Sequence, residues 1–376
     1  MICRKAIKYR LRPTEDQTIL FAKTFGCVRK VYNLMLDDKI KFYNDQHKML
    51  HNTPAQYKQD YPYLKEVDSL ALANAALHLD QAYKNFFNQP KVGFPKFKAK
   101  HKTKKSYTTN NQNGTIAIMD GHIKLPKVGK VKAVLHRLPS DSWNLKSATI
   151  SQDPDGKYYA SLLFEYDVEI TPVAVSDENA IGLDYKSDGL YMDSNGFCPH
   201  PHKRFRELQT KLAKEQRKLS RRCGPRKGAK PSNNYKKQKA KVAKLQRHIA
   251  NQRLDFLHKH STMIAKLYDV VAVEELNLKA IASKKSLKNG KATMDNAYGI
   301  FKTMLKYKLE DLGKYFVIVG KYYPSSQLCS CCGNRKKLKL SERTYVCDCG
   351  MIMDRDMNAA INIKNEGLRL VTVTMQ

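Results

Sequence analysis

Five cysteines crowded between Cys329 and Cys349 constrain the fold of this chain more than any other feature of its sequence. The segment CSCCGNRKKLKLSERTYVCDCG places Cys329 and Cys332 as a C-x-x-C pair and Cys347 and Cys349 as a C-x-C pair, each followed by glycine. Two such turns around a charged hairpin are typical of a zinc ribbon, in which four thiolates hold the ion tetrahedrally. We therefore predict a ribbon at about 322–352, with a structural Zn²⁺ because protein ligands fill all four positions.

Two questions stay open at this cluster: which thiols are the ligands, and whether the thiols bind zinc or form a redox centre. Cys331 offers another ligand, but the glycine after Cys332 matches the glycine after Cys349 and favours Cys332. A redox centre is the alternative to zinc, although no thioredoxin-like strand-helix-strand pattern accompanies these thiols. Clustering in a large chain without a secretory segment favours metal over disulfides. The scattered cysteines are therefore expected to be reduced: Cys3, Cys27, Cys198 and Cys223.

The charge balance indicates a polyanionic partner. The chain of 376 residues has 68 Lys and Arg against 35 Asp and Glu, a formal net charge of +33. Such a surface repels itself unless a polyanion neutralises it, so nucleic acid is the first partner to consider and an anionic membrane surface the second. No apolar run approaches the roughly 20 residues that span a bilayer, and the first residues lack a secretory apolar segment. We expect two or three domains, no membrane partner, and a cytoplasmic or nucleoid-associated protein of a prokaryote.

The first hundred residues predict one strand followed by helices. CRKAIKYRLRP alternates basic and apolar residues, which indicates a strand ended by Pro13. Apolar residues at helical spacing then follow the N-cap Thr14 and predict a pair of helices broken near Gly26. A further helix is expected at 69–87. The basic stretch that follows contains interleaved aromatic residues, KVGFPKFKAKHKTKK.

A small β-domain is predicted next. Short alternating runs extend from about 106 to 168, and Asp155 with Gly156 gives a strong hairpin signal between two of them. We interpret these runs as a barrel that the first strand of the chain completes. The helices would then be an insertion between the first and second strands.

The second half of the chain shows a mixed α/β order. The expected elements are antiparallel strands at 181–199, a long basic helical region at about 202–267, a buried strand at 268–276, a helix at 302–316 and a strand at 317–324. This order is of the ribonuclease H type. The basic block from Lys203 to Arg253 and the earlier KVGFPKFKAKHKTKK stretch are predicted to contact nucleic-acid backbone without sequence specificity.

Three acids stand where an α/β sheet presents catalytic groups. Asp184 closes the apolar run AIGLD, Glu274 closes VVAVE, and Asp356 opens the helix in DRDMNAAINI. Carboxylates that converge at one sheet edge suit Mg²⁺, and two such ions about 4 Å apart can cleave a phosphodiester. An acid at a strand end, such as Asp184, has a simpler interpretation as a solvated side chain. Asp354 and Asp356 also compete for two roles, helix cap and inward ligand, and the pattern favours Asp356 as the ligand.

With these motifs in place the chain resembles the TnpB family, the RNA-guided DNA endonucleases of bacterial insertion sequences that are related to type V CRISPR effectors. The resemblance spans nearly the whole chain through KYRLRPTEDQ, FGCVRKVYN, NFFNQPKVGFPKFKAK, GLDYKSDG, VAVEELN, SSQLCSCCG and CDCGMIMDRDMNAAINI. It implies a multidomain α+β protein. The implied parts are a wedge-type β-barrel at 1–12 and 101–172, a helical recognition domain at 13–100, and a RuvC (ribonuclease H-like) nuclease domain at 173–376 that carries the zinc ribbon.

The resemblance also implies site residues and partners. Asp184, Glu274 and Asp356 match the three RuvC carboxylates, and the four cysteines of the two pairs match the zinc ligands. Family members pair a guide RNA, encoded at the transposon end, with double-stranded target DNA beside a short flanking motif. We expect a Mg²⁺-dependent endodeoxyribonuclease, monomeric on one RNA. The alternatives are a strand-joining transposase and a nuclease-dead RNA-guided regulator, and the presence of all three acids favours the enzyme.

Overall fold

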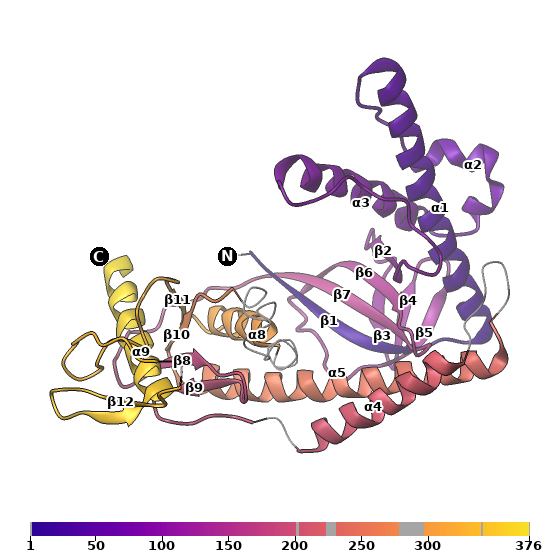
Figure 1. The fold of residues 1–376 in the computed structure, drawn as a ribbon. Helices are drawn as coiled ribbons and strands as arrows, with labels where there is room; N and C mark the ends of the chain where they lie inside the picture. The colour runs from indigo at the N-terminus through magenta and orange to yellow at the C-terminus, as the bar shows by residue number, and fades with distance from the viewer. Residues whose placement is uncertain (1, 201–202, 223–230, 278–296, 340, 376) are drawn as a thin grey trace. The chain divides into compact units, whose positions relative to one another are not determined.

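The computed structural model divides the chain into two compact units, Met1–Glu169 and Ile170–Gln376 (Figure 1). It describes residues 2–200, 203–222, 231–277, 297–339 and 341–375. Cys223, one of the cysteines expected to be reduced, lies outside these residues. Within the described part, none of the helices combines the length and apolar character needed to cross a bilayer.

The first unit is built on a seven-stranded antiparallel sheet in the order β2-β6-β7-β1-β5-β4-β3. The predicted first strand is β1, and its apolar residues Ile7, Tyr9 and Leu11 are buried in alternation with exposed basic residues. The predicted hairpin joins β6 to β7, with Gly156 at a φ of +87°. The strands are β1 (Ile2–Arg12), β2 (Lys105–Asn110), β3 (Ala117–Met119), β4 (His122–Leu125), β5 (Gly129–Val134), β6 (Asn144–Gln152) and β7 (Tyr158–Asp167).

This sheet is a half-barrel. The first strand does join the later ones, since β1 lies between β7 and β5. In the part of the chain that the structure describes, however, the edge strands β2 and β3 do not pair with each other. The predicted β-domain is therefore present as an open, curved sheet.

A single helix replaces the predicted helical pair. Helix α1 runs without a break through Gly26 and begins with the predicted cap, in which Gln17 N–H donates to Thr14 Oγ1 at 3.4 Å. Glycine costs a helix only about 1 kcal/mol relative to alanine, and the buried neighbours Phe25 and Val28 pack into the core of the unit. The helical elements are α1 (Glu15–Gln46), η1 (Pro54–Gln56), α2 (Tyr57–Asp60), η2 (Pro62–Lys65) and α3 (Ser69–Asn88).

The second unit contains a four-stranded sheet in the order β11-β10-β8-β9. Strand β10 is parallel to both β8 and β11, and β9 pairs with β8 in the antiparallel direction. The predicted order of elements is thus present, although the helix expected at 302–316 ends at Glu310 because the chain turns at Gly313, whose φ is +70°. The strands are β8 (Ala180–Tyr185), β9 (Tyr191–Asp193), β10 (Val270–Glu274) and β11 (Tyr315–Val319).

Helices cover both faces of this sheet. Ile181 and Val271 point to one face and pack with residues of α5 (Asn233–Leu267) and α8 (Tyr298–Glu310). Helix α9 (Arg355–Met375), yellow in Figure 1, crosses the other face. The long basic region predicted between β9 and β10 forms α4 (Lys203–Arg221) and α5, which pack against each other.

Two glycines let α9 approach the sheet closely. A Cβ at Gly182 of β8 would lie 2.0 Å from the carbonyl oxygen of Ala360 in α9. A Cβ at Gly367 of α9 would lie 2.3 Å from the Cβ of Ala272 in β10. The helix axis is therefore held against β8 and β10, with no side chain between the backbones at Gly182.

Gly182→Ala should destabilise the protein by about 1–3 kcal/mol, because the new methyl group meets helix backbone that cannot move aside like a flexible side chain. Gly320→Ala is the control in the same unit, since a Cβ there meets nothing within 4 Å. Thermal unfolding of both variants measures the effect. Equal melting temperatures for the two variants would contradict the close contact.

Candidate active site and cysteine cluster

Asp184 and Glu274 stand side by side at the carboxyl edge of the sheet. In the parallel ladder Leu183 is level with Val273, so the next residue of each strand is an acid. Side chains alternate along a strand, which puts Asp184 on the face of Gly182 and Glu274 on the face of Ala272. That face is the one that α9 covers.

The third acid comes from the first turn of α9. Asp354 Oδ1 accepts hydrogen bonds from the backbone N–H of Asp356 at 2.9 Å and of Met357 at 3.1 Å, so Asp354 caps the helix. Asp356 faces the acid cluster, where its carboxylate is close enough to raise the pKa of Asp184. Asp354 thus has the capping role, and the role of Asp356 as the metal ligand stays a prediction.

The three carboxylates interact electrostatically. Burial is the largest cause that raises the pKa of the half-buried Asp184 well above its usual range, and the charges of Glu274 and Asp356 raise it further. Burial also raises the pKa of Glu274, against which the nearby Lys302 ammonium acts. Ionising these carboxyl groups therefore costs free energy in the folded protein, and a bound cation would offset that cost.

The donor set of this cluster fits a hard cation. All three side chains offer oxygen, the ligand atom that Mg²⁺ prefers, and Mg²⁺ usually keeps several waters. The buried hydroxyl of Tyr298, which lies near Asp184 and Glu274, has no hydrogen-bond partner among the described protein groups and suits such a water.

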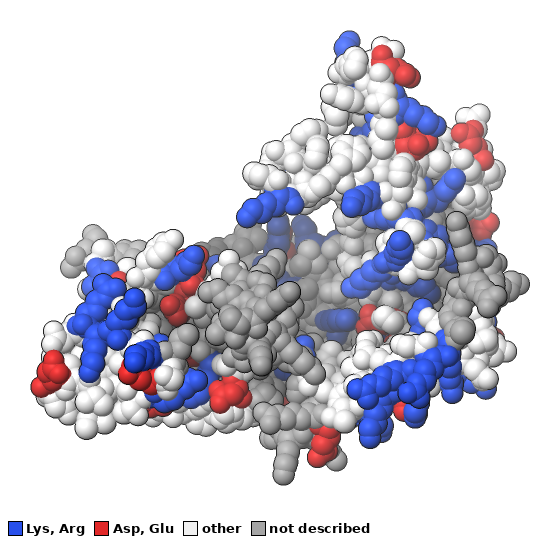
Figure 2. All heavy atoms as spheres, in the orientation of Figure 1, with Lys and Arg blue, Asp and Glu red and all other residues white. Residues whose placement is uncertain are grey.

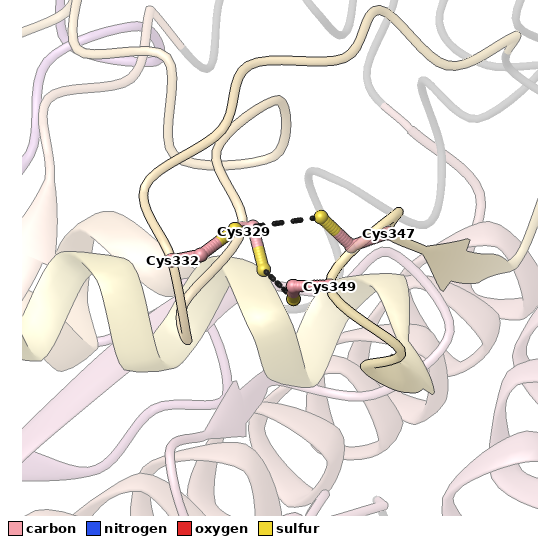
Figure 3. Close-up of side chains that lie close together, drawn as sticks. All are labelled: Cys329, Cys332, Cys347 and Cys349. Carbon is pink, nitrogen blue, oxygen red and sulfur yellow. Dashed lines mark hydrogen bonds between the residues drawn. The ribbon is translucent and has the colours of Figure 1, made fainter.

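The four cysteines of the two predicted pairs converge on one point (Figure 3). Their Sγ atoms all lie within 4.8 Å of one another, with Cys329 to Cys349 at 3.7 Å and Cys332 to Cys347 at 3.5 Å. Tetrahedral bonds of about 2.3 Å place thiolates about 3.8 Å apart, so the spacing fits a metal ion. The exposed Cys331 is not part of the group.

Two similar turns build this cluster. Gly333 N–H donates to Cys329 O at 2.9 Å, and Gly350 N–H donates to Cys347 O at 3.0 Å. Both glycines have positive φ, +74° and +90°, which explains why a glycine ends each pair. Two short antiparallel strands support the second turn, β12 (Thr344–Val346) and β13 (Ile352–Asp354).

Asparagines of α9 bind the cysteine turns to the helix. Asn358 accepts from Ser330 N–H at 2.9 Å and donates to Leu328 O at 2.7 Å, while Asn362 donates to Ser325 O and Leu328 O at 2.8 Å each. Both side chains are buried. These asparagines carry no motif that predicts the contact, and their spacing of four residues, which puts both on one helix face, is the only local signal.

Three protein-family models match the chain in succession. Residues 1–48 match one described as a helix-turn-helix domain, residues 163–285 one described as a probable transposase, and residues 298–363 one described as the Cas12f1-like TNB domain. In the structure the first of these stretches is β1 followed by the single helix α1.

The fold defines the structural class. Cas12f1, solved by cryo-electron microscopy with sgRNA and target DNA, matches with a TM-score of 0.61 at 12% identity, over 97% of this chain and 99% of that chain. The protein is therefore of the mixed α+β class of Cas12f1, with a half-barrel sheet in its first unit.

Two relatives extend over nearly the whole chain. The "Putative RNA-guided DNA endonuclease" of Streptomyces pristinaespiralis is 34% identical over 379 aligned positions, 97% of this chain and 90% of the relative. The "Putative RNA-guided DNA endonuclease InsQ" of Escherichia coli is 29% identical over 385 positions, 96% and 92% of the two chains. The chain belongs to the family of these relatives, the TnpB family.

Asp184→Asn should stabilise the protein at alkaline pH when no divalent metal is added. The raised pKa means that the folded protein holds the Asp184 proton more tightly than the unfolded chain does. The stability from this group is therefore lost as pH rises from the ordinary carboxyl range through the raised pKa. We expect the melting temperature of the variant to exceed that of the wild type at pH 8 and the difference to shrink toward pH 5.

The exposed Asp188 in the same hairpin supplies the control. Asp188→Asn removes an equal charge at an exposed position and should not reproduce the stabilisation at pH 8. If the wild type and Asp184→Asn have the same melting temperature at pH 8, burial and like charge do not make ionised Asp184 unfavourable in the folded protein.

Proposed function

We propose that this chain is an RNA-guided DNA endonuclease of a transposon, which cuts target DNA beside a short flanking motif at a site formed by Asp184, Glu274 and Asp356. The observation that carries the proposal is the convergence of three acids, far apart in the sequence, at one edge of the second-unit sheet. The names of the full-length relatives and the fold shared with Cas12f1 support it.

The residues of the site divide the work of phosphodiester hydrolysis. When bound, Mg²⁺ activates the attacking water and stabilises the leaving oxygen. Asp184 and Glu274 would hold the cation from two adjacent strands, and Asp356 would complete the site from α9. The Tyr298 hydroxyl would orient a water beside the acids, and burial of the cluster would strengthen each of these electrostatic contacts.

The four thiolates would hold a structural Zn²⁺. All four ligands come from the protein, and no position is left for a substrate. The pKa of the Cys329 thiol is about 7; burial acts to raise it, but hydrogen bonds from backbone amides of the turn stabilise its thiolate. Thiolate is the form that binds zinc, so the turn prepares this ligand for the ion.

We assign the parts of the chain by the TnpB resemblance. Residues 1–12 and 101–172 would be the wedge-type barrel, 13–100 the recognition domain, and 173–376 the RuvC nuclease domain with its ribbon at about 322–352. One protein monomer would bind one RNA, encoded at the transposon end, and base pairing would select the double-stranded target.

Basic surfaces in each unit are suited to nucleic-acid backbone. Figure 2 shows Lys and Arg side chains gathered over α4, where exposed cations recur at helical spacing in Lys211, Lys214, Lys218 and Arg221. These residues belong to the predicted basic block, of which 223–230 lie outside the described residues. In the first unit, Asn33 holds the backbone of Lys98 through hydrogen bonds of 2.8 and 3.0 Å in the basic, aromatic loop after α3.

Strand joining is the second candidate function, because residues 163–285 match a model described as a probable transposase. Carboxylate-bound metal supports cleavage and strand transfer alike. The products separate the two functions, since a transposase joins the cut ends and a nuclease leaves them free. A nuclease-dead regulator is disfavoured by the presence of all three acids.

The protein expressed with its native flanking DNA should co-purify with a structured RNA and cut a matching target in Mg²⁺. Sequencing the bound RNA, and challenging the complex with a target flanked by randomised DNA, identifies guide and motif together. Asp184→Ala or Glu274→Ala should abolish cleavage and leave RNA and target binding largely intact, because the basic surfaces are unchanged.

Asp188→Ala is the matched control, an exposed acid of the same hairpin, and should cut like the wild type. Cleavage that survives Asp184→Ala would sink the assignment of the site. Purified protein that carries no RNA would contradict RNA guidance. Protein that joins DNA ends would identify a strand-joining transposase instead of a nuclease.

Cys347→Ser should release zinc and lower the melting temperature, because three thiolates no longer complete the tetrahedron. Cys331→Ser removes a thiol from the same segment but from outside the quartet, and it should keep the metal. Elemental analysis and thermal unfolding give the two readouts. A metal-free, fully stable Cys347→Ser protein would contradict the structural role.

A further inference from the structure

A lysine already binds one of the three acids. Lys186, which directly follows β8, places its Nζ atom 3.2 Å from Asp356 Oδ2. Both side chains are shielded, with 22% of the lysine and 21% of the aspartate exposed. An ion pair with this much shielding is screened less by salt than one on an open surface.

The position of Lys186 links two elements of the acid cluster. Asp184 lies near the end of β8, two residues before Lys186, whereas Asp356 belongs to α9. The ammonium therefore tethers the helix that supplies the third acid to the strand that supplies the first. Asp184 and Asp356, as ligands of one cation, would connect the same two elements.

The second lysine beside the cluster makes different contacts. Lys302 Nζ donates to the backbone oxygen of Glu274 at 3.4 Å and lies 5.7 Å from the ring centroid of Tyr298. Lys302 thus donates to the backbone carbonyl group of Glu274 and not to its carboxylate. Lys186, by contrast, occupies a carboxylate oxygen that the proposed metal would need.

We infer that Lys186 is the built-in counter-ion of the acid cluster, which holds Asp356 near Asp184 before metal binds and which an incoming divalent cation must displace. This inference rests on the proposed metal site. Its consequence is that Lys186 keeps the empty site assembled and at the same time weakens the apparent affinity for metal, since part of the binding energy goes to breaking the ion pair.

The test measures Mn²⁺ binding by electron paramagnetic resonance on the full-length, zinc-loaded protein without nucleic acid. Lys186→Met should bind Mn²⁺ more tightly than the wild type, by about fivefold if a shielded ion pair is lost from the competing state. In buffer without added divalent metal the same variant should melt at a lower temperature. Added Mg²⁺ should close that gap, because a bound ion does what the lysine did.

Lys364→Met is the matched control. Lys364, which is 20% exposed, pairs from α9 with the exposed Asp177 at 3.1 Å, so the variant removes an equal charge from a similarly shielded lysine elsewhere on the same helix. It should bind Mn²⁺ like the wild type. If it gains affinity as Lys186→Met does, the effect is one of net charge and the inference is overturned.

Double substitution shows whether Lys186 acts through Asp356. In an Asp356→Asn background, Lys186→Met should no longer change the melting temperature in metal-free buffer, because the ion pair is already lost. If Lys186→Met lowers the melting temperature as much in this background as in the wild type, Lys186 does not act through Asp356 and its role is purely structural. Unchanged or weaker Mn²⁺ binding by Lys186→Met would also overturn the inference.

Asp184→Asn separates this outcome from failure of the proposed function. If Mn²⁺ binding is lost in Asp184→Asn but unchanged in Lys186→Met, the metal site stands and only the role of Lys186 fails. If Asp184→Asn binds Mn²⁺ like the wild type, the metal site itself is wrong.

Discussion

The close packing of α9 against the parallel sheet is the contact on which the second unit depends. At Gly182 the helix backbone meets the strand directly, and Gly367 repeats the close approach at β10. Because protein interiors are packed as densely as crystals, these two contacts fix the depth and direction of the helix. Asp356 then lies near the edge where β8 and β10 place Asp184 and Glu274 side by side, and Asn358 brings the cysteine turns to the same helix.

The acid cluster departs from the satisfied polar contacts found nearby. Asp354 caps a helix through two backbone N–H groups, and the buried Asn362 donates to two carbonyl groups. For Asp184, in contrast, burial and the charges of Glu274 and Asp356 outweigh the backbone hydrogen bond from Tyr185 and the charge of Arg355, so its pKa is raised. Unfavourable local electrostatics is found mainly at functional sites. The raised pKa of Asp184 therefore indicates function more strongly than the presence of three acids in the sequence does.

Local patterns predicted the elements well, and long-range contacts explain what they missed. The strand before Pro13 and the hairpin at Gly156 follow from alternation and turn chemistry, and the thiol spacing alone gave the four cysteines that converge. Gly26 was read as a break, yet burial of the flanking apolar residues keeps α1 continuous. The ion pair of Lys186 joins segments that no local pattern connects, so only the folded chain reveals it.

The position of α9 at the end of the second unit also sets when the acid cluster is completed during synthesis. Ribosomes make every strand of the second-unit sheet, and the helices of the other face, before they make α9. Until α9 is synthesised, the nascent chain lacks Asp356. Until α9 docks, one face of β8 and β10 is uncovered. Contacts between such distant segments form late in folding. A chain still on the ribosome would thus display its basic helices to nucleic acid well before it carried a complete set of acids.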